Sequence, residues 1–133
     1  MIERSHRAGV RGGFTLMEML VVVAIIVLLA AMAAPIVMGR LEQAKIDRAK
    51  VDCRSIAEMV EMYQLKYGEF PPTLEALAQP GADGTKPFIE ARHLLDPWNR
   101  QYQYAPNGPH NQVTGKPDVW TIGPNGQQIG NWT

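Results

Sequence analysis

Residues 13–38 read GFTLMEMLVVVAIIVLLAAMAAPIVM, and this stretch decides the fold. From Met19 to Met38 it carries no charged side chain, and these 20 residues are enough to cross a bilayer core of about 30 Å as a helix. Glu18 lies just inside the N-terminal end of the run, where a carboxylate is costly, by about 2.5–3.5 kcal/mol at a helix centre and less toward the ends. An acid in such a place usually has a partner and a function, so Glu18 is a candidate site residue.

The charge before this run predicts its orientation. Residues 1–13 carry three arginines and one glutamate, which gives a side-chain charge of +2 (three minus one) when His6 is neutral. Basic residues beside a first span keep that end in the cytoplasm. We therefore expect a single-pass membrane protein with residues 1–13 in the cytoplasm, a transmembrane helix over 14–39 and a domain over 40–133 on the periplasmic or extracellular side.

Gly13, Phe14 and Glu18, followed by a long apolar run, resemble the class III signal of type IV pilins and pseudopilins. In that family the prepilin peptidase cuts after the glycine and methylates the new N-terminus. The resemblance implies that residues 1–13 are a removed leader and that Phe14 becomes the N-methylated first residue. It also implies that Glu18 binds the Phe14 amine of an adjacent subunit during assembly. Pro35 stands where the family weakens its long helix.

Two other interpretations of the N-terminal segment remain open. An ordinary secretory signal would use Ala31-Met32-Ala33 as its cleavage site and release a secreted or anchored binding domain. Against it, Glu18 falls where the apolar core of such a signal begins, and the apolar run continues to Met38. A plain uncleaved anchor is the second alternative, and it leaves Gly13 and Glu18 without a role.

An amphipathic helix is predicted over residues 40–67, which contain neither proline nor glycine. Its apolar positions recur at helical spacing and mark one face, which we expect to pack against the chain's own sheet. These positions are Ala49, Cys53, Ile56, Val60, Tyr63 and Tyr67. Cys53 is the only cysteine, so an internal disulfide is impossible, and we expect it to be a small buried hydrophobic residue. Gly68 is a natural helix stop.

Residues 68–133 read as loops with a few short strands. Thr73 can cap a short helix that runs to Leu77. Alternating patterns predict strands over 101–105 and 118–122, separated by segments rich in proline, glycine and asparagine. The expected fold class is α+β: a long N-terminal helix, half transmembrane and half amphipathic, packed on a small antiparallel sheet in a pilin-like arrangement.

The C-terminal half also resembles one branch of the pilin family, the major pseudopilin of the type II secretion system. The resemblance is carried by residues 67–71 (YGEFP), 96–99 (DPWN), 118–123 (DVWTIG) and 129–132 (IGNW). It implies a structural subunit of a periplasmic pseudopilus that drives protein export. Its partners would be further copies of the chain in a helical filament, minor pseudopilins, the prepilin peptidase and an inner-membrane assembly platform. A type IV pilin for adhesion, motility or DNA uptake is the alternative, although those proteins more often carry a C-terminal disulfide.

The same family binds calcium in the loop between its last strand and the C-terminus, and here the sequence departs from the pattern. Asn125 stands where an acid is usual, and Asp118 is the only acid after Asp96. Calcium prefers six to eight oxygen ligands, several of them charged. We therefore expect no resident cofactor and a loop closed by Trp132. A weak calcium site built from Asp118 and Asn125 is the alternative.

Other functional classes find little support in the sequence. Without residues 1–13 the chain has 10 basic and 12 acidic residues, a net charge of −2, and no basic patch interleaved with aromatic residues. Nucleic acid is therefore not expected as a partner. His93 and His110 lie in different predicted loops, and neither has an acid or a nucleophile at a spacing that is typical of a catalytic motif. We expect the protein not to be an enzyme.

Overall fold

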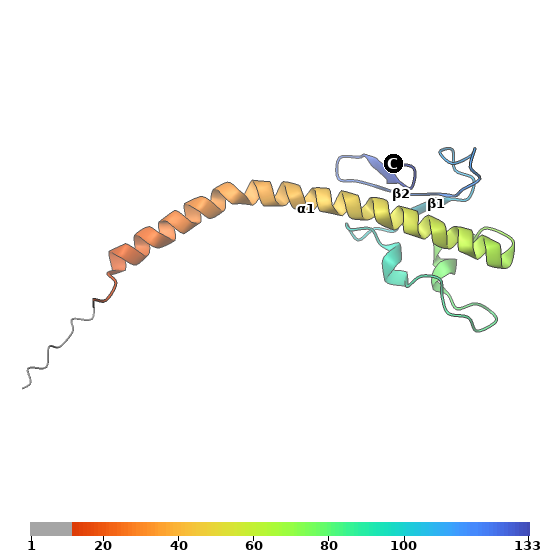
Figure 1. Cartoon of the computed structure of the whole chain (residues 1–133), viewed down its shortest axis with the longest axis horizontal. Coiled ribbons are helices and arrows are strands. Elements are labelled where there is room, and N and C mark those ends of the chain that lie inside the picture. The colour runs from red at the N-terminus through yellow and green to blue at the C-terminus, as the bar shows by residue number, and fades with distance from the viewer. Residues whose placement is uncertain (1–11) are drawn as a thin grey trace, which may run out of the picture. The chain divides into compact units, whose positions relative to one another are not determined.

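The computed structural model describes residues 12–133, so all but the last two residues of the expected leader lie outside it. The chain forms two compact units, one ending at Gly39 and the other spanning Arg40–Thr133. Figure 1 shows the helix α1, which runs through both, and the small sheet that lies beside its C-terminal half. Each unit is described separately below.

Helix α1 spans Leu16–Tyr67, 52 residues, as one uninterrupted α-helix. The predicted long helix is therefore confirmed, and it continues through Pro35 and Gly39. It ends at Gly68, which has a φ of +84°, a left-handed conformation that glycine adopts without the steric cost of a Cβ atom. In the first unit the apolar side chains of α1 are exposed: Leu16 is 81% exposed and Met32 is 74% exposed.

The core of the second unit lies between α1 and the C-terminal half of the chain. Burial of apolar area is the main favourable term in folding, so these contacts hold the unit together. The core side chains of this cluster are Cys53, Ile56, Ala57, Val60, Leu74, Leu77, Leu94, Tyr102 and Val119. The predicted apolar face of α1 is thus buried from Ala49 to Val60.

The sheet has three antiparallel strands in the order β1-β2-β3. They are β1 (Gln103–Ala105), β2 (Asp118–Ile122) and β3 (Gln128–Gly130). In β2 the side chains of Val119 and Thr121 are buried, whereas Ile122 at its end is exposed. The α+β class with an antiparallel sheet on a long helix is confirmed.

Several local predictions were wrong in detail. The strand expected over 101–105 is shorter, because only an isolated bridge joins Gln101 to Leu95 before β1 begins. Thr73 does precede a short helix, but this is the 3₁₀ helix η1 (Leu74–Ala78), and the Thr73 side chain makes no capping hydrogen bond. Tyr67 is 40% exposed rather than buried, and its ring packs on Tyr63 instead, with the centroids 4.5 Å apart.

Candidate functional site

The predicted processing site lies at the start of the described chain, ahead of α1. Gly13 and Phe14 are exposed and non-helical, and a Cβ atom added at Gly13 would meet no other atom within 4 Å. Phe14 as a whole is 81% exposed. The peptide bond between these two residues is therefore accessible to a protease, two residues before the helix begins at Leu16.

Glu18 is bound by its own chain. The Thr15 N–H donates to Glu18 Oε2 at 2.8 Å and the Thr15 hydroxyl to the same oxygen at 3.2 Å. In return the Glu18 N–H donates to Thr15 Oγ1 at 3.2 Å. This reciprocal arrangement is a capping box, which satisfies N–H groups that the first helical turn leaves without partners. The partial positive charge of a helix N-terminus also favours a carboxylate at this position.

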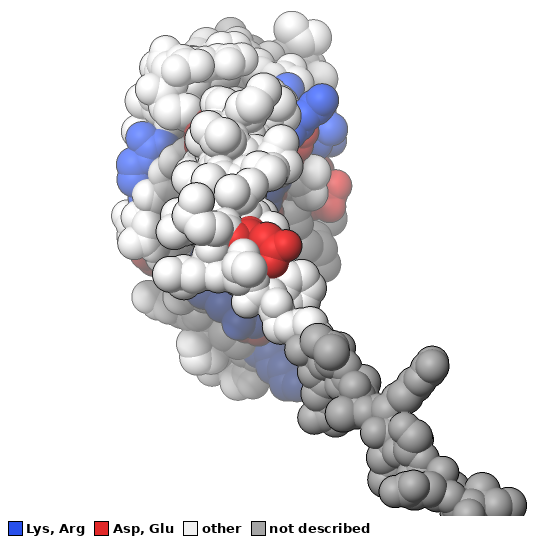
Figure 2. All heavy atoms as spheres, turned by 90° about the vertical axis from the view of Figure 1, so that its left-hand side faces the viewer, with Lys and Arg blue, Asp and Glu red and all other residues white. Residues whose placement is uncertain are grey.

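The surface around this capping box is apolar. Figure 2 views the molecule from this side, and the nearest described surface is uncharged apart from an acidic patch. Within residues 12–39 Glu18 is the only charged side chain. Residues Phe14, Met17, Met19, Val21 and Val22 line a shallow hollow together with Glu18. The Glu18 carboxylate is therefore the one charged hydrogen-bond acceptor in this hollow, and apolar side chains surround it.

Pro35 lies inside α1 and does not break it. Proline has no N–H and its ring clashes with the carbonyl four residues earlier, here that of Ala31. Since one helical hydrogen bond is lost at this point, we expect residues 31–39 to bend or unwind more easily than the helix on either side. The proposed role of Pro35 in assembly stays a prediction.

The two candidate calcium ligands, Asp118 and Asn125, lie apart. Asp118 begins β2 and Asn125 lies in the turn beyond its other end. The four residue steps from Asp118 to Ile122 alone span about 13 Å at 3.3 Å per residue. The structure therefore does not bring these two side chains to one ion. Among the described residues, no group of three or more His, Cys, Asp or Glu side chains could hold a metal.

Asp118 is instead the centre of a hydrogen-bonded cluster that sequence reasoning missed. Its side chain is fully buried, and its Oδ2 accepts hydrogen bonds from the His110 N–H at 3.0 Å and from His110 Nδ1 at 3.2 Å. Its Oδ1 accepts from Asn111 Nδ2 at 2.7 Å. A buried carboxylate is tolerated only with partners of this kind.

The C-terminus closes over this cluster. The Trp132 indole stacks on the His110 ring, with centroids 3.7 Å apart and planes within 2°. Asn131 bridges the same region, because its Oδ1 accepts from the Val119 N–H at 3.1 Å and its Nδ2 donates to the Pro117 carbonyl at 2.8 Å. We call the set His110, Asn111, Asp118, Asn131 and Trp132 the C-terminal clasp. The expected packing of Trp132 back onto the domain is thus present.

Asp96 is a second buried carboxylate, and it organises its own turn. Its Oδ1 accepts from the N–H groups of Trp98 at 3.0 Å and of Arg100 at 2.8 Å. Its Oδ2 accepts from the Thr121 hydroxyl at 2.5 Å and is 3.1 Å from Arg100 Nη2. The structure therefore makes Asp96 a turn residue that fixes the backbone of its own loop.

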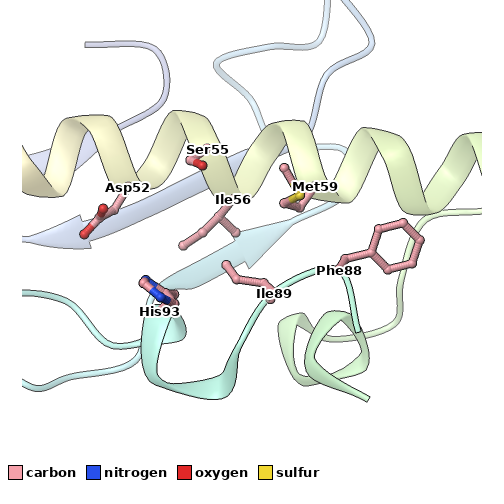
Figure 3. A pocket seen from close by; sticks show the side chains of 7 residues that line it. All are labelled: Asp52, Ser55, Ile56, Met59, Phe88, Ile89 and His93. Atoms are coloured by element: carbon pink, nitrogen blue, oxygen red, sulfur yellow. The ribbon is translucent and has the colours of Figure 1, made fainter. Parts of the chain in front are cut away.

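A cleft of about 170 Å³ between α1 and the segment of residues 88–93 contains the polar side chains of Asp52, Ser55 and His93 (Figure 3). Among residues 12–133 these three make no hydrogen bond to one another; Asp52 instead accepts from the Tyr102 hydroxyl at 3.1 Å. Nucleophilic catalysis requires the nucleophile and its base within hydrogen-bonding distance. The cleft therefore presents no such pair, and Asp52 serves to hold Tyr102 against α1.

Cys53 is buried on the core face of α1, as predicted. Its Sγ donates to the Ile129 carbonyl at 3.5 Å, which ties β3 to the helix. Burial, together with the nearby charges of Asp52 and Asp96, raises the pKa of this thiol to about 12. A thiolate is the reactive form, so the folded protein keeps Cys53 inert.

Comparisons with known proteins agree with these features. The family model described as "Type II secretion system (T2SS), protein G" matches residues 36–132, and the "Prokaryotic N-terminal methylation motif" matches residues 10–34. "Type II secretion system core protein G" of Pseudomonas aeruginosa is 36% identical, covering 92% of this chain and 95% of the relative. The protein of the same name from Pectobacterium carotovorum is 34% identical, covering 90% and 83%.

A solved structure shares the fold. It is the major pseudopilin from the type 2 secretion system of enterohaemorrhagic Escherichia coli, with a TM-score of 0.53 and 25% sequence identity. The match covers 71% of this chain and 88% of that one. The predicted resemblance is confirmed, and this chain belongs to the type II secretion system protein G family.

Proposed function

We propose that this chain is the major structural subunit of a periplasmic pseudopilus that drives protein export by type II secretion. The observation that carries the proposal is the succession, in one chain, of a methylation motif over residues 10–34 and a protein G domain over residues 36–132. The protein is membrane-anchored through the apolar half of α1 before assembly. Members of the family are structural subunits, and we assign no catalytic step to this one.

Processing at the N-terminus is the first step. The prepilin peptidase would cut between Gly13 and Phe14 and methylate the new amine of Phe14. The accessible, non-helical peptide bond ahead of α1 supports this step. Residues 1–13 would face the cytoplasm, residues 14–39 would span the inner membrane and residues 40–133 would lie in the periplasm, as the arginines of the leader predict.

The apolar half of α1 is compatible with two states of the subunit, one anchored in the membrane and one packed in the filament. Among the described residues α1 is the one helix long and apolar enough to cross a membrane, and its most apolar window is 0% buried. Such a surface requires either lipid or the helices of neighbouring subunits around it. In the filament, Glu18 would accept a charge-assisted hydrogen bond from the Phe14 amine of an adjacent subunit. Head-to-tail contacts that do not close into a ring produce a helical filament.

Further partners follow from this role. Minor pseudopilins would begin the filament, and an inner-membrane assembly platform would add subunits to it. These partners are proposed from the family and from the exposed assembly surface at the start of α1.

A secretion assay tests the proposed function. In a strain from which the gene is deleted, exoproteins should accumulate in the periplasm, and the wild-type gene should restore their release. The matched control is the gene carrying a conservative core change, Ile56→Val, which should restore release equally well. Normal exoprotein release in the deletion strain, with loss of surface pili or of DNA uptake, would show a type IV pilin instead.

A further inference from the structure

A loop of the second unit is hydrogen-bonded to α1 close to the residue at which that unit begins. Trp98 Nε1 donates to Glu42 Oε1 at 2.8 Å, which joins the loop of residues 96–100 to α1. The loop itself is held by Asp96, which accepts from the Trp98 and Arg100 N–H groups. Both ends of the Trp98 residue, backbone and indole, are therefore fixed.

This attachment point lies close to the end of the membrane-spanning run. Glu42 follows Met38, the last residue of the uncharged run, by four residues. Four residues cover about 6 Å in a helix and at most about 14 Å when fully extended. The headgroup layer on each side of a bilayer is about 5–8 Å thick. Because α1 is helical here, Glu42, to which Trp98 is hydrogen-bonded, lies about 6 Å along the helix axis from the end of the uncharged run, a length similar to the thickness of the headgroup layer.

The side chains at this end suit a membrane surface. Tryptophan is enriched at membrane–water interfaces, because its ring is apolar and its N–H is polar. The guanidinium carbon of Arg100 lies 5.5 Å from the centroid of the Trp98 ring. Leu41, next to Glu42, is 53% exposed, and Ile122, whose carbonyl accepts a hydrogen bond from Arg100 Nη2, is 38% exposed.

Charge contributes little to this surface. Residues 40–48 contain three basic and two acidic side chains. Lys45 lies 3.8 Å from Glu42, and Arg48 lies 3.5 Å from Asp52, so two of the basic groups already have acidic neighbours. Attraction to anionic lipid would be weak and screened by salt. We therefore expect any contact with lipid to depend on Trp98, which is half-buried, and on the exposed apolar side chains.

We propose that Leu41, Trp98, Arg100 and Ile122 form a lipid-contact surface that rests on the phospholipid headgroups of the membrane in which the chain is anchored. The inference relies on the membrane anchoring that the proposed function also requires. The unassembled subunit is then held at two places, by its apolar helix and by this surface. Entry into a filament must break both contacts.

Depth-dependent fluorescence quenching tests this surface. The full chain is reconstituted in vesicles of phosphatidylcholine and phosphatidylglycerol that carry a spin label either on the headgroup or deep in the acyl chain. The chain contains three tryptophans, Trp98, Trp120 and Trp132. We expect the headgroup label to quench roughly a third of the emission, the deep label to quench far less, and high salt to leave both results unchanged.

Two matched variants assign the quenched emission. Trp98→Phe should abolish headgroup quenching, whereas the double variant Trp120→Phe/Trp132→Phe, which retains Trp98, should have nearly all its emission quenched. Equal quenching of the wild type and Trp98→Phe, or none in either, would overturn the proposal. Quenching that disappears as the protein-to-lipid ratio rises would also overturn it, because a second copy would then cover the surface.

Flotation of the same vesicles separates this inference from the proposed function. If the chain does not float with the vesicles, it is not anchored, and the proposed function fails as well. If it floats while Trp98 is not quenched, only the lipid-contact surface is refuted.

Discussion

Thr15 and Glu18 form a reciprocal capping box at the N-terminal end of α1. Glu18 Oε2 accepts both hydrogen bonds from Thr15, while the Glu18 N–H donates back to Thr15 Oγ1. Among the described residues no donor reaches Glu18 Oε1. The carboxylate of a single subunit is therefore partly satisfied, through Oε2 alone. In the proposed filament, Oε1 would be the oxygen that is open to the Phe14 amine of an adjacent subunit.

Replacing Glu18 with Val or Gln should leave membrane insertion and cleavage intact but abolish filament incorporation. The amine of the adjacent subunit would be buried without its partner, and removal of one member of a buried pair costs about 3–5 kcal/mol. The measurement is the yield of sheared filaments together with exoprotein release. Met17→Leu, one residue earlier on the same exposed surface, is the control and should assemble normally. Wild-type filament yield from Glu18→Val would refute the pairing role.

The processing site gives a second prediction. The intact mass of the membrane-extracted protein should correspond to a chain that starts at Phe14 and carries one methyl group. Gly13→Leu should leave the precursor uncut, because a peptidase site fitted to glycine has no room for a larger side chain. Gly12→Ala, one residue away and equally exposed, should be cut normally. A mature chain that starts at Ala34 would show an ordinary secretory signal instead.

The sequence predicted the long helix well, because its signals are local. An uncharged run, an apolar face repeating from Ala49 to Val60 and a stop at Gly68 all lie within one continuous stretch. It predicted β2 for the same reason, since the strand-favouring residues from Val119 to Ile122 form a short run that Gly123 and Pro124 close. The strand β3 was not predicted. Ile129 between Gln128 and Gly130 shows no alternating pattern, and its strand depends on pairing with β2.

The C-terminal clasp could not be predicted from the sequence either. His110 and Asn111 lie in a turn-rich segment, and they meet Asp118 and Trp132 only after the chain has folded back on itself. One signal could have indicated it. Asp118 is an acid at the start of an otherwise apolar strand, and a buried acid requires donors from elsewhere in the chain. The sequence shows that Asp118 needs hydrogen-bond donors, but it does not show that His110 and Asn111 provide them.

The clasp leads to a third prediction, about stability. A Cβ atom added at Gly108 would overlap the Asp118 carboxylate, so Gly108→Ala should displace it from His110 and Asn111. We expect a loss of about 1–3 kcal/mol in the free energy of unfolding, measured by urea denaturation. Asp118→Ala should cost a similar amount, since it leaves buried donors without an acceptor. Asn125→Ala, in an exposed turn, is the control and should change little.

The buried thiol gives a fourth prediction, on pH. Burial raises the pKa of the Cys53 thiol from its ordinary value of 9.0 to about 12 in the folded protein. Between these two values the unfolded chain loses a proton that the folded chain keeps, so the contribution of Cys53 to stability should fall as pH rises from 9 to 12. Below pH 9 this contribution is constant. Labelling with iodoacetamide at pH 8 should require unfolding, and rapid labelling of the folded protein would contradict the burial of Cys53.

Calcium dependence is the last prediction, and it concerns the loop in which this chain departs from its family. Binding an ion only in the native state adds about 2.7 kcal/mol of stability at a hundredfold excess over the dissociation constant. Asp118 already has three hydrogen bonds from His110 and Asn111, and it lies far from Asn125, so we expect its carboxylate to be unavailable to an ion. Residues 40–133, which form a compact unit, should therefore melt at the same temperature in millimolar calcium and in chelator. The control is the same pair of melts on Asn125→Ala. A calcium-dependent rise in melting temperature that is lost in Asp118→Ala would show that a calcium site exists and that the ion displaces the His110 and Asn111 contacts.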